Sequence, residues 1–218
     1  MKSTLVACAM MEDELNYVFE KTGCSFPVIW IDRGYHNTPE KLRLKLQETI
    51  DGLQDQDEIL LAFGLCGNGT EGIVSRKATL ILPQFDDCIN MLLCTGERTT
   101  RALTKADAIY MTRGWMYDDE SIMAKNDEYI ENYGEETTQD ILAMMYAHYQ
   151  RIAIIDTESY PMEAVEEYAD KAGSLLDLSI EKVKGSTKIL EQLLERDWNE
   201  NFIVQPPGEP LRSVQWNC

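Results

Sequence analysis

Short β-rich runs alternate with segments of helical spacing along the first half of the chain, and this alternation constrains the fold more than any other feature. The runs are largely apolar and about four to eight residues long, which is typical of strands buried on both faces. They cover residues 5–10, 26–32, 57–65 and 78–85. Strands that are separated by helices predict βαβ units, and therefore a mostly parallel sheet with helices on both of its faces.

The clearest helical pattern between two of these runs lies over residues 38–53. Thr38 is the expected N-cap, and Pro39 stands at the first helical position, where the fixed φ of proline suits a helix. One face collects the apolar side chains, namely Leu42, Leu46, Ile50 and Leu53. We therefore expect this helix to pack on the sheet.

After residue 88 the pattern becomes mainly helical before strands return. Helices are expected over residues 89–94, 99–110, 138–149, 162–176 and 186–198, with a polar stretch around residues 117–138. Strands are expected over residues 151–157, 176–183 and 202–207, the last of which would close the sheet. The sequence therefore predicts an α/β fold with a Rossmann-like, mostly parallel sheet flanked by helices and a helical insertion in the middle. No low-complexity linker interrupts it, so residues 1–218 are expected to form a single domain.

The charge balance limits the partners of this chain. Lys and Arg number 20 against 38 Asp and Glu, which gives a net charge of −18. Nucleic acid and anionic membrane surfaces are therefore not expected as main partners, because each phosphate would be met by the protein's own negative field. No apolar run approaches the ~20 residues of a membrane span, and the first residues do not resemble a signal peptide. We expect a cytoplasmic protein with reduced thiols.

Six cysteines are scattered along the chain, at Cys8, Cys24, Cys66, Cys88, Cys94 and Cys218. There is no CxxC pair, no HExxH motif and no compact zinc-finger spacing. A metal site would therefore have to be assembled from distant parts of the chain. Cys24, Cys94 and Cys218 lie in a turn, in an apolar run and at the terminus, and we assign no role to them.

The other three cysteines, Cys8, Cys66 and Cys88, follow the ends of three expected strands. In an open parallel sheet, ligands bind beyond the carboxyl ends of the strands, so these thiols are expected to converge. Three protein ligands with an open fourth position are the arrangement of catalytic zinc. We predict that the three thiolates bind a metal ion and favour zinc, because no CxxxCxxC run is present. An iron–sulfur cluster is the alternative.

Two neighbouring features complete the predicted site. The loop after the third strand reads GLCGNGTEG, and Gly67 and Gly69 are expected to adopt backbone angles that other residues rarely take. Gly67, Asn68 and Gly69 are expected to bind a ligand through their backbone N–H groups. The loop does not match the phosphate-binding GxxxxGK[ST] pattern, and we predict no nucleotide there. His36 follows the second strand and is a candidate catalytic acid or base. His36, Asp86 or an exogenous ligand would take the fourth metal position.

Several motifs together carry a family resemblance: VACAMMEDEL, YHNTPEKL, ILLAFGLCGNGTEGI, ATLILPQFDDCINMLL, YMTRGW and FIVQPPGEP. With these segments in this order, the chain resembles the domain of unknown function 1638 family, which occurs largely in anaerobes. The resemblance implies functional cysteines at Cys8, Cys66 and Cys88 and an HN pair at His36 and Asn37. Members are often encoded beside corrinoid-dependent methyltransferase systems, which implies a role in methyl-group metabolism.

Three kinds of function remain open from the sequence. The first is a metal-dependent transferase that acts on a small molecule or on a corrinoid protein. The second is a non-catalytic accessory protein of a methyltransferase system, although the DxHxxG-type signature of a cobalamin-binding module is missing. The third is an acidic α/β domain with buried cysteines and only an interaction role. The oligomeric state is not indicated.

Overall fold

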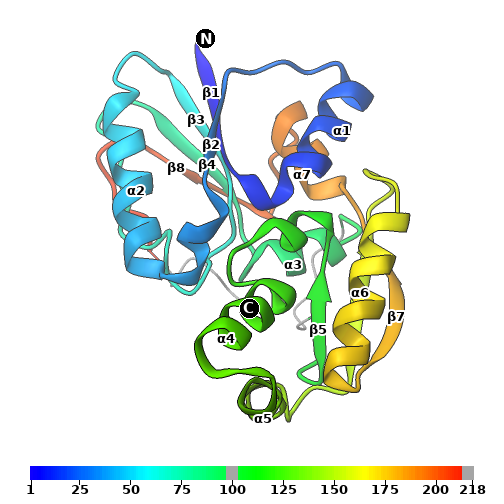
Figure 1. The fold of residues 1–218 in the computed structure, drawn as a ribbon. Coiled ribbons are helices and arrows are strands. Elements are labelled where there is room, and N and C mark those ends of the chain that lie inside the picture. Colours follow the sequence, from blue (N-terminus) through cyan, green and yellow to red (C-terminus); the bar gives the residue numbers. More distant parts are fainter. Residues whose placement is uncertain (97–102, 213–218) are drawn as a thin grey trace.

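The computed structural model describes residues 1–96 and 103–212 and contains two mostly parallel β-sheets flanked by helices (Figure 1). The first sheet has the strand order β2-β1-β3-β4-β8. Its strands are β1 (Ser3–Cys8), β2 (Val28–Ile31), β3 (Glu58–Ala62), β4 (Thr79–Pro83) and β8 (Phe202–Gln205). The first four run parallel, and β8 pairs antiparallel with β4. The mixed α/β class and the expected strands of the amino-terminal half are thus confirmed.

The second sheet was not expected as a separate unit. It contains β5 (Ala108–Met111), β6 (Arg151–Asp156) and β7 (Ser179–Lys184), all parallel. The prediction of one continuous sheet fails because β8 lies antiparallel at the edge beside β4 and ends the first sheet there. Strand pairings of this kind join residues far apart in the sequence, and local periodicity does not report them.

The helices follow the pattern expected for βα units. They are α1 (Glu12–Thr22), α2 (Pro39–Gly52), α3 (Cys88–Leu93), α4 (Ile122–Tyr133), α5 (Glu135–Met145), α6 (Glu163–Leu176) and α7 (Lys188–Glu195). Three short 3₁₀ helices follow strands: η1 (Ala9–Met11), η2 (Arg33–Asn37) and η3 (Arg113–Tyr117). Figure 1 shows α2 on one side of the first sheet and α1 and α7 on the other.

Two segments differ from the sequence-based expectation. The helix expected over residues 99–110 is wrong where it can be compared, since residues 108–110 belong to β5, and residues 99–102 lie outside the described ranges. Pairing of β5 with β6 overrides the helical spacing of the local sequence. The polar stretch contains α4, whose buried residues are only Ile122 and Asn126, so it lacks an apolar stripe that could have predicted it.

The first sheet and its helices enclose the larger apolar core. All five residues of β3 are buried, and so are Leu42, Leu46 and Ile50 on the inner face of α2. Burying one such leucine or isoleucine stabilises the fold by about 1.5–3 kcal/mol. Ile155 of β6 belongs to the same cluster, so the second sheet shares this core. The carboxyl ends of the four parallel strands consequently form a fixed edge, from which the loops of the site emerge.

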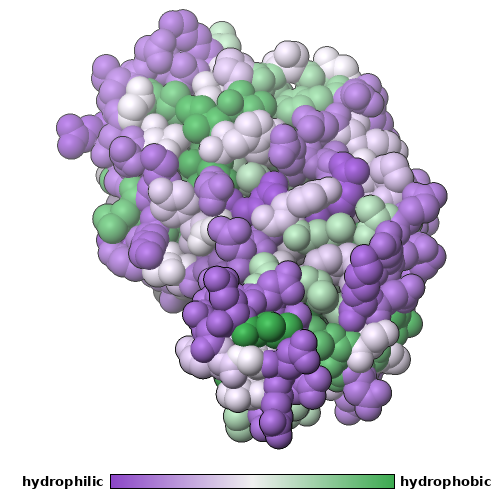
Figure 2. All heavy atoms as spheres, viewed as in Figure 1, coloured by the Kyte–Doolittle hydropathy of each residue, from purple (hydrophilic) through white to green (hydrophobic). Residues whose placement is uncertain are grey.

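Figure 2 shows hydrophilic side chains over much of the displayed face, with apolar groups in separate patches. Within the described part of the chain, no helix combines the length and the apolar character that crossing a membrane requires.

Candidate functional site

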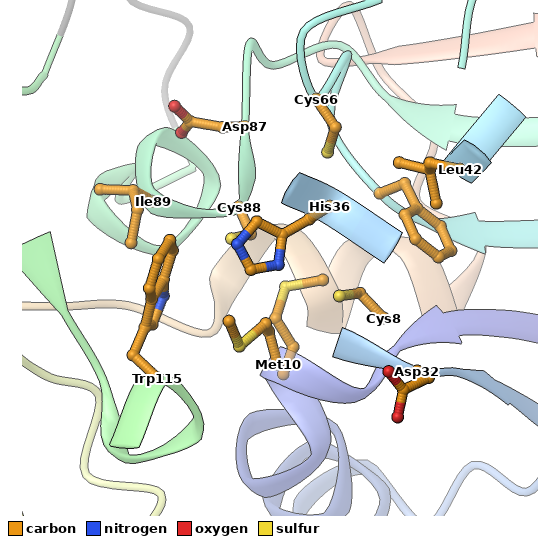
Figure 3. A pocket seen from close by; sticks show the side chains of 12 residues that line it. Cys8, Met10, Asp32, His36, Leu42, Cys66, Asp87, Cys88, Ile89 and Trp115 are labelled. Carbon is orange, nitrogen blue, oxygen red and sulfur yellow. The ribbon is translucent and has the colours of Figure 1, made fainter. Parts of the chain in front are cut away.

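A cavity of about 230 Å³ lies at the carboxyl edge of the first sheet. It is lined by Cys8, Met10, Met11, Asp32, His36, Leu42, Phe63, Cys66, Asp87, Cys88, Ile89 and Trp115. Figure 3 shows the side chains of Cys8, Cys66 and His36 pointing into the same space. All but one of the lining residues come from the first sheet, its loops and its helices, and Trp115 of η3 reaches the cavity from the second sheet.

The structure brings the three cysteines of the predicted metal site to this one cavity. Cys8 is the last residue of β1, Cys66 lies in the loop after β3, and Cys88 is the first residue of α3 after β4. No disulfide joins the five cysteines that fall in the described ranges. Cys24 and Cys94 do not line the cavity, and Cys218 lies outside the described residues.

Close contact between two loops places Cys66 beside Cys88. Backbone N–H groups of Leu65 and Cys66 donate to the carbonyl oxygens of Phe85 and Asp86, at 2.7 and 2.8 Å. A Cβ atom on Gly64 would lie 2.7 Å from the Cα atom of Asp87, so only glycine permits this approach. The loops after β3 and β4 are therefore held together by their backbones.

The three thiols are neutral at physiological pH. Burial raises the pKa of Cys8 to about 11 and that of Cys66 to about 12, and it raises the pKa of Cys88 well above its usual value. Negative charge on Cys8 raises the pKa of Cys66 further, and charges on Cys66 and Cys8 do the same for Cys88. The three groups are thus close enough to interact electrostatically.

The cavity is not a preformed metal centre. No group of three or more His, Cys, Asp or Glu side chains within residues 1–96 and 103–212 is arranged so that it could hold a metal ion. Asp87 lines the cavity, and its Oδ1 atom caps α3 by accepting from the N–H of Asn90 at 2.7 Å. Asp86, the residue of this loop that was predicted as a possible fourth ligand, does not line the cavity.

The loop after β3, which reads GLCGNGTEG, adopts only part of the expected conformation. Gly67 has a positive φ of 63°, as predicted, but Gly69 does not, so the prediction for Gly69 is wrong. Gly69 is required for packing, since an added Cβ would lie 2.7 Å from a methyl carbon of Leu42, and its N–H donates to the carbonyl of Cys66. Gly67, Asn68 and Gly69 do not line the cavity, and their role in ligand binding stays a prediction.

His36 is held with one ring nitrogen available. Its Nδ1 atom lies 2.6 Å from the carbonyl oxygen of Arg33, so we assign the hydrogen to Nδ1, which donates to that oxygen. The Nε2 atom is then an acceptor that can bind a metal ion or take a proton. Trp115 packs on the ring with a centroid distance of 5.0 Å, and the Oδ2 atom of Asp118 lies 3.9 Å from Nδ1.

Trp115 and Asp118 were missed by the sequence analysis. Asp118 is buried, and its Oδ2 atom has no hydrogen-bond partner among the described residues. The sequence signal was an Arg-Gly-aromatic triplet that occurs twice, at residues 33–35 and 113–115. In both cases one residue separates the triplet from the end of the preceding strand. The two triplets form η2 and η3, which contribute His36 and Trp115 to the same cavity.

The fold and the cavity together define an α/β protein with two mostly parallel sheets and a site of three thiols and one imidazole at the edge of the first. The chain belongs to the family described as "Protein of unknown function (DUF1638)", whose model matches residues 30–194. His36, Cys66 and Cys88 lie inside the matched range, and Cys8 precedes it. No curated protein and no solved structure matches the chain.

Proposed function

We propose that the cavity binds one metal ion through Cys8, Cys66 and Cys88, with zinc favoured, and that a small substrate reacts at this centre. The convergence of three thiols from three different strand ends on one cavity is the observation that carries the proposal. Soft sulfur ligands suit zinc, and a set of three leaves a fourth coordination position open. The iron–sulfur cluster is the alternative occupant.

The thiols would need to approach one another for this role. Each sulfur must come within ~2.3 Å of a common centre, and the described residues are not yet so arranged. All three thiols are neutral without a cation, so each must lose its proton when the ion binds. Binding of the ion is therefore coupled to proton release and to rotation of the three side chains.

The size of the cavity supports a substrate beside the ion. By the same measure of volume, a single water needs about 10–15 Å³, so about 230 Å³ has room for an ion and several further atoms. A bound zinc ion would act as a Lewis acid and favour the deprotonated form of a water or thiol in its open position. His36, with its Nε2 atom available, is the acid or base that would receive or return the proton.

The family resemblance also suggests a biological setting for the proposed site. The family resemblance suggests a cytoplasmic transferase of anaerobic methyl-group metabolism, working with a corrinoid protein or with a small methyl donor or acceptor. This setting is supported by the resemblance alone.

Metal analysis of protein purified without oxygen or chelator tests the proposal. We expect about one equivalent of zinc in the parent, since few strong bonds carry the affinity of such a site. Cys66→Ser and Cys88→Ser should abolish stoichiometric metal, and Cys8→Ser should weaken its binding strongly.

Cys24→Ser and Cys94→Ser are the matched controls, because neither thiol lines the cavity, and both should keep the metal content of the parent. Iron together with sulfide and visible absorption would assign the cluster instead. A parent without metal, or cavity variants that bind metal as the parent does, would overturn the proposal.

A further inference from the structure

A polar groove of about 500 Å³ lies beside the thiol cavity. It is lined by Arg33 of η2, by Arg113 and Tyr117 of η3, and by the acidic start of α1 at Glu12 and Asp13. The groove thus places two arginines beside two acidic residues, in a chain with 38 acidic and 20 basic residues.

The two arginines differ in how their charges are matched. Arg113 binds Asp13 through two parallel hydrogen bonds, one of them 2.8 Å from Nε to Oδ2, so this pair is neutral as a unit. Arg33 donates from Nη2 to the carbonyl of Ala9 at 3.3 Å, and its guanidinium lies 5.4 Å from the ring centroid of Tyr117. The nearest carboxylate oxygen that pairs with it, on Glu12, is 4.0 Å away, beyond hydrogen-bond range.

Arg33 therefore presents donors for which the described residues supply no carboxylate partner at hydrogen-bond distance. A guanidinium has five N–H donors arranged in a fork that matches an oxyanion. Its side chain is only 21% exposed, so water does not surround it fully. Packing on Tyr117 fixes its orientation, which reduces the entropy that an arriving anion would have to remove.

The groove adjoins the thiol cavity through two short stretches of chain. Ala9 lines the groove, while its neighbours Cys8 and Met10 line the cavity. Asp32, the residue before Arg33, lines the cavity. Asp32 and Arg33 also line a smaller hollow, and Arg33 lines the groove as well. The charge of Arg33 also lowers the pKa of the Cys8 thiol, against the larger effect of burial.

The surrounding charges limit the ligand to one with a single anionic group. Glu12 lines the groove, and Asp32 and Asp119 line the smaller hollow. These carboxylates repel a polyanion such as a nucleotide, whereas one oxyanion can be paired with Arg33 alone.

We propose that Arg33 binds the carboxylate, or a similar single oxyanion, of a small substrate whose other end enters the thiol cavity. This assignment rests on the proposed function, because it names the substrate class of the same site. The substrate is thus an organic acid with a metal-binding group, such as a thiol, at a short distance from the anionic group.

Binding of propionate to the metal-free protein tests the groove by itself. Its affinity, followed by NMR at the backbone amide signals of η2 and η3, should fall at least tenfold in Arg33→Gln, because a charge-assisted fork is lost. Arg33→Lys keeps the charge without the fork and should lose less. Arg43→Gln is the matched control, since Arg43 lies on the exposed face of α2 and pairs with Glu40.

Binding to the zinc-loaded protein tests the connection to the cavity. There 3-mercaptopropionate should bind more tightly than either propionate or 1-propanethiol, because only the mercapto acid engages both ends of the site. Thermal unfolding of each variant shows whether it is folded.

The outcomes separate this inference from the proposed function. If the parent binds no zinc while propionate binding still depends on Arg33, the metal proposal fails and the anion site stands. If zinc binds but propionate shows no Arg33-dependent affinity, the inference is overturned. It is also overturned if the folded Arg33→Lys variant and the Arg33→Gln variant bind propionate as the parent does.

Discussion

Individual residues at this site show how burial governs their chemistry. Burial keeps the thiols of Cys8, Cys66 and Cys88 neutral, because it raises their pKa values. The charge of Arg33 lowers the pKa of Cys8, but by less than burial raises it. Glu14 of α1 shows the same effect for a carboxyl group. It is fully buried, its Oε2 atom has no partner among the described residues, and its Oε1 atom accepts from Thr157 at 3.3 Å. Burial raises its pKa to about 7.

Glu14→Gln is expected to stabilise the protein above neutral pH. A carboxyl whose pKa is raised by folding favours the folded state at low pH, and this contribution is lost as the pH rises from about 4.5 through about 7. The uncharged amide avoids that loss. We expect the free energy of unfolding at pH 8 to rise by roughly 1–3 kcal/mol, and the gain to shrink towards zero at pH 4.

Urea denaturation at the two pH values measures this difference. Glu48→Gln is the control, because Glu48 lies on the exposed face of α2 and should change stability little at either pH. A gain in Glu14→Gln that is equal at both pH values would contradict the assignment of a buried, titrating carboxyl.

Elements close the cavity through contacts between turns. The 3₁₀ helix η3 follows β5 of the second sheet, and it packs on η1, which follows β1 of the first. Gly114 of η3 permits this contact, since an added Cβ would lie only 2.1 Å from the backbone carbonyl oxygen of Met10. Trp115, the next residue, is thereby placed against His36.

Gly114→Ala should therefore separate η3 from η1 and open the cavity. Backbone atoms cannot yield as a flexible side chain does, so we expect a loss of roughly 1–3 kcal/mol in the free energy of unfolding. The cavity thiols should also react faster with a thiol reagent. Gly52→Ala is the control, because an added Cβ there meets nothing within 4 Å.

Removal of glycine at position 52 reduces the freedom of the unfolded chain, so this control should be neutral or slightly stabilising. Equal stability and equal thiol reactivity in the Gly114→Ala and Gly52→Ala variants would show that the turn contact does not close the cavity.

The elements also show which parts of the fold the sequence could predict. β1 to β4 and α2 were predictable, because a buried strand or an amphipathic helix carries its periodicity within a few residues. The three cysteines could be assigned to one edge because each follows a strand of that sheet. The division into two sheets, by contrast, depends on the pairing of β8 with β4, more than 100 residues apart in the chain. Trp115 and Asp118 follow β5, which belongs to the second sheet. The strand ends of the first sheet therefore could not reveal them.

At the scale of the whole molecule, the site couples the two sheets. The ends of strands of the first sheet and the segments that follow them provide the three thiols, and η3, which follows a strand of the second sheet, provides the wall formed by Trp115. Ile155 of β6 is buried in the larger core, so we expect the two sheets to unfold together. A ligand that binds the assembled cavity must therefore stabilise the whole folded molecule, and not only the loops that it contacts.

Zinc is expected to raise the free energy of unfolding of the entire chain. At a free zinc concentration of about 100 times the dissociation constant, mass action gives a gain of about 2.7 kcal/mol, and somewhat less because unfolded cysteines also bind zinc. The gain should decrease as the pH is lowered, since protons compete for all three thiols.

Urea denaturation, followed separately by tryptophan fluorescence and by far-ultraviolet circular dichroism, measures this gain in the free energy of unfolding. Both signals should shift to the same higher midpoint in the parent and in Cys94→Ser, and neither should shift in Cys66→Ser. A shift seen in one signal alone would mean that zinc holds only part of the molecule, and an equal shift in Cys66→Ser would place the zinc outside the cavity.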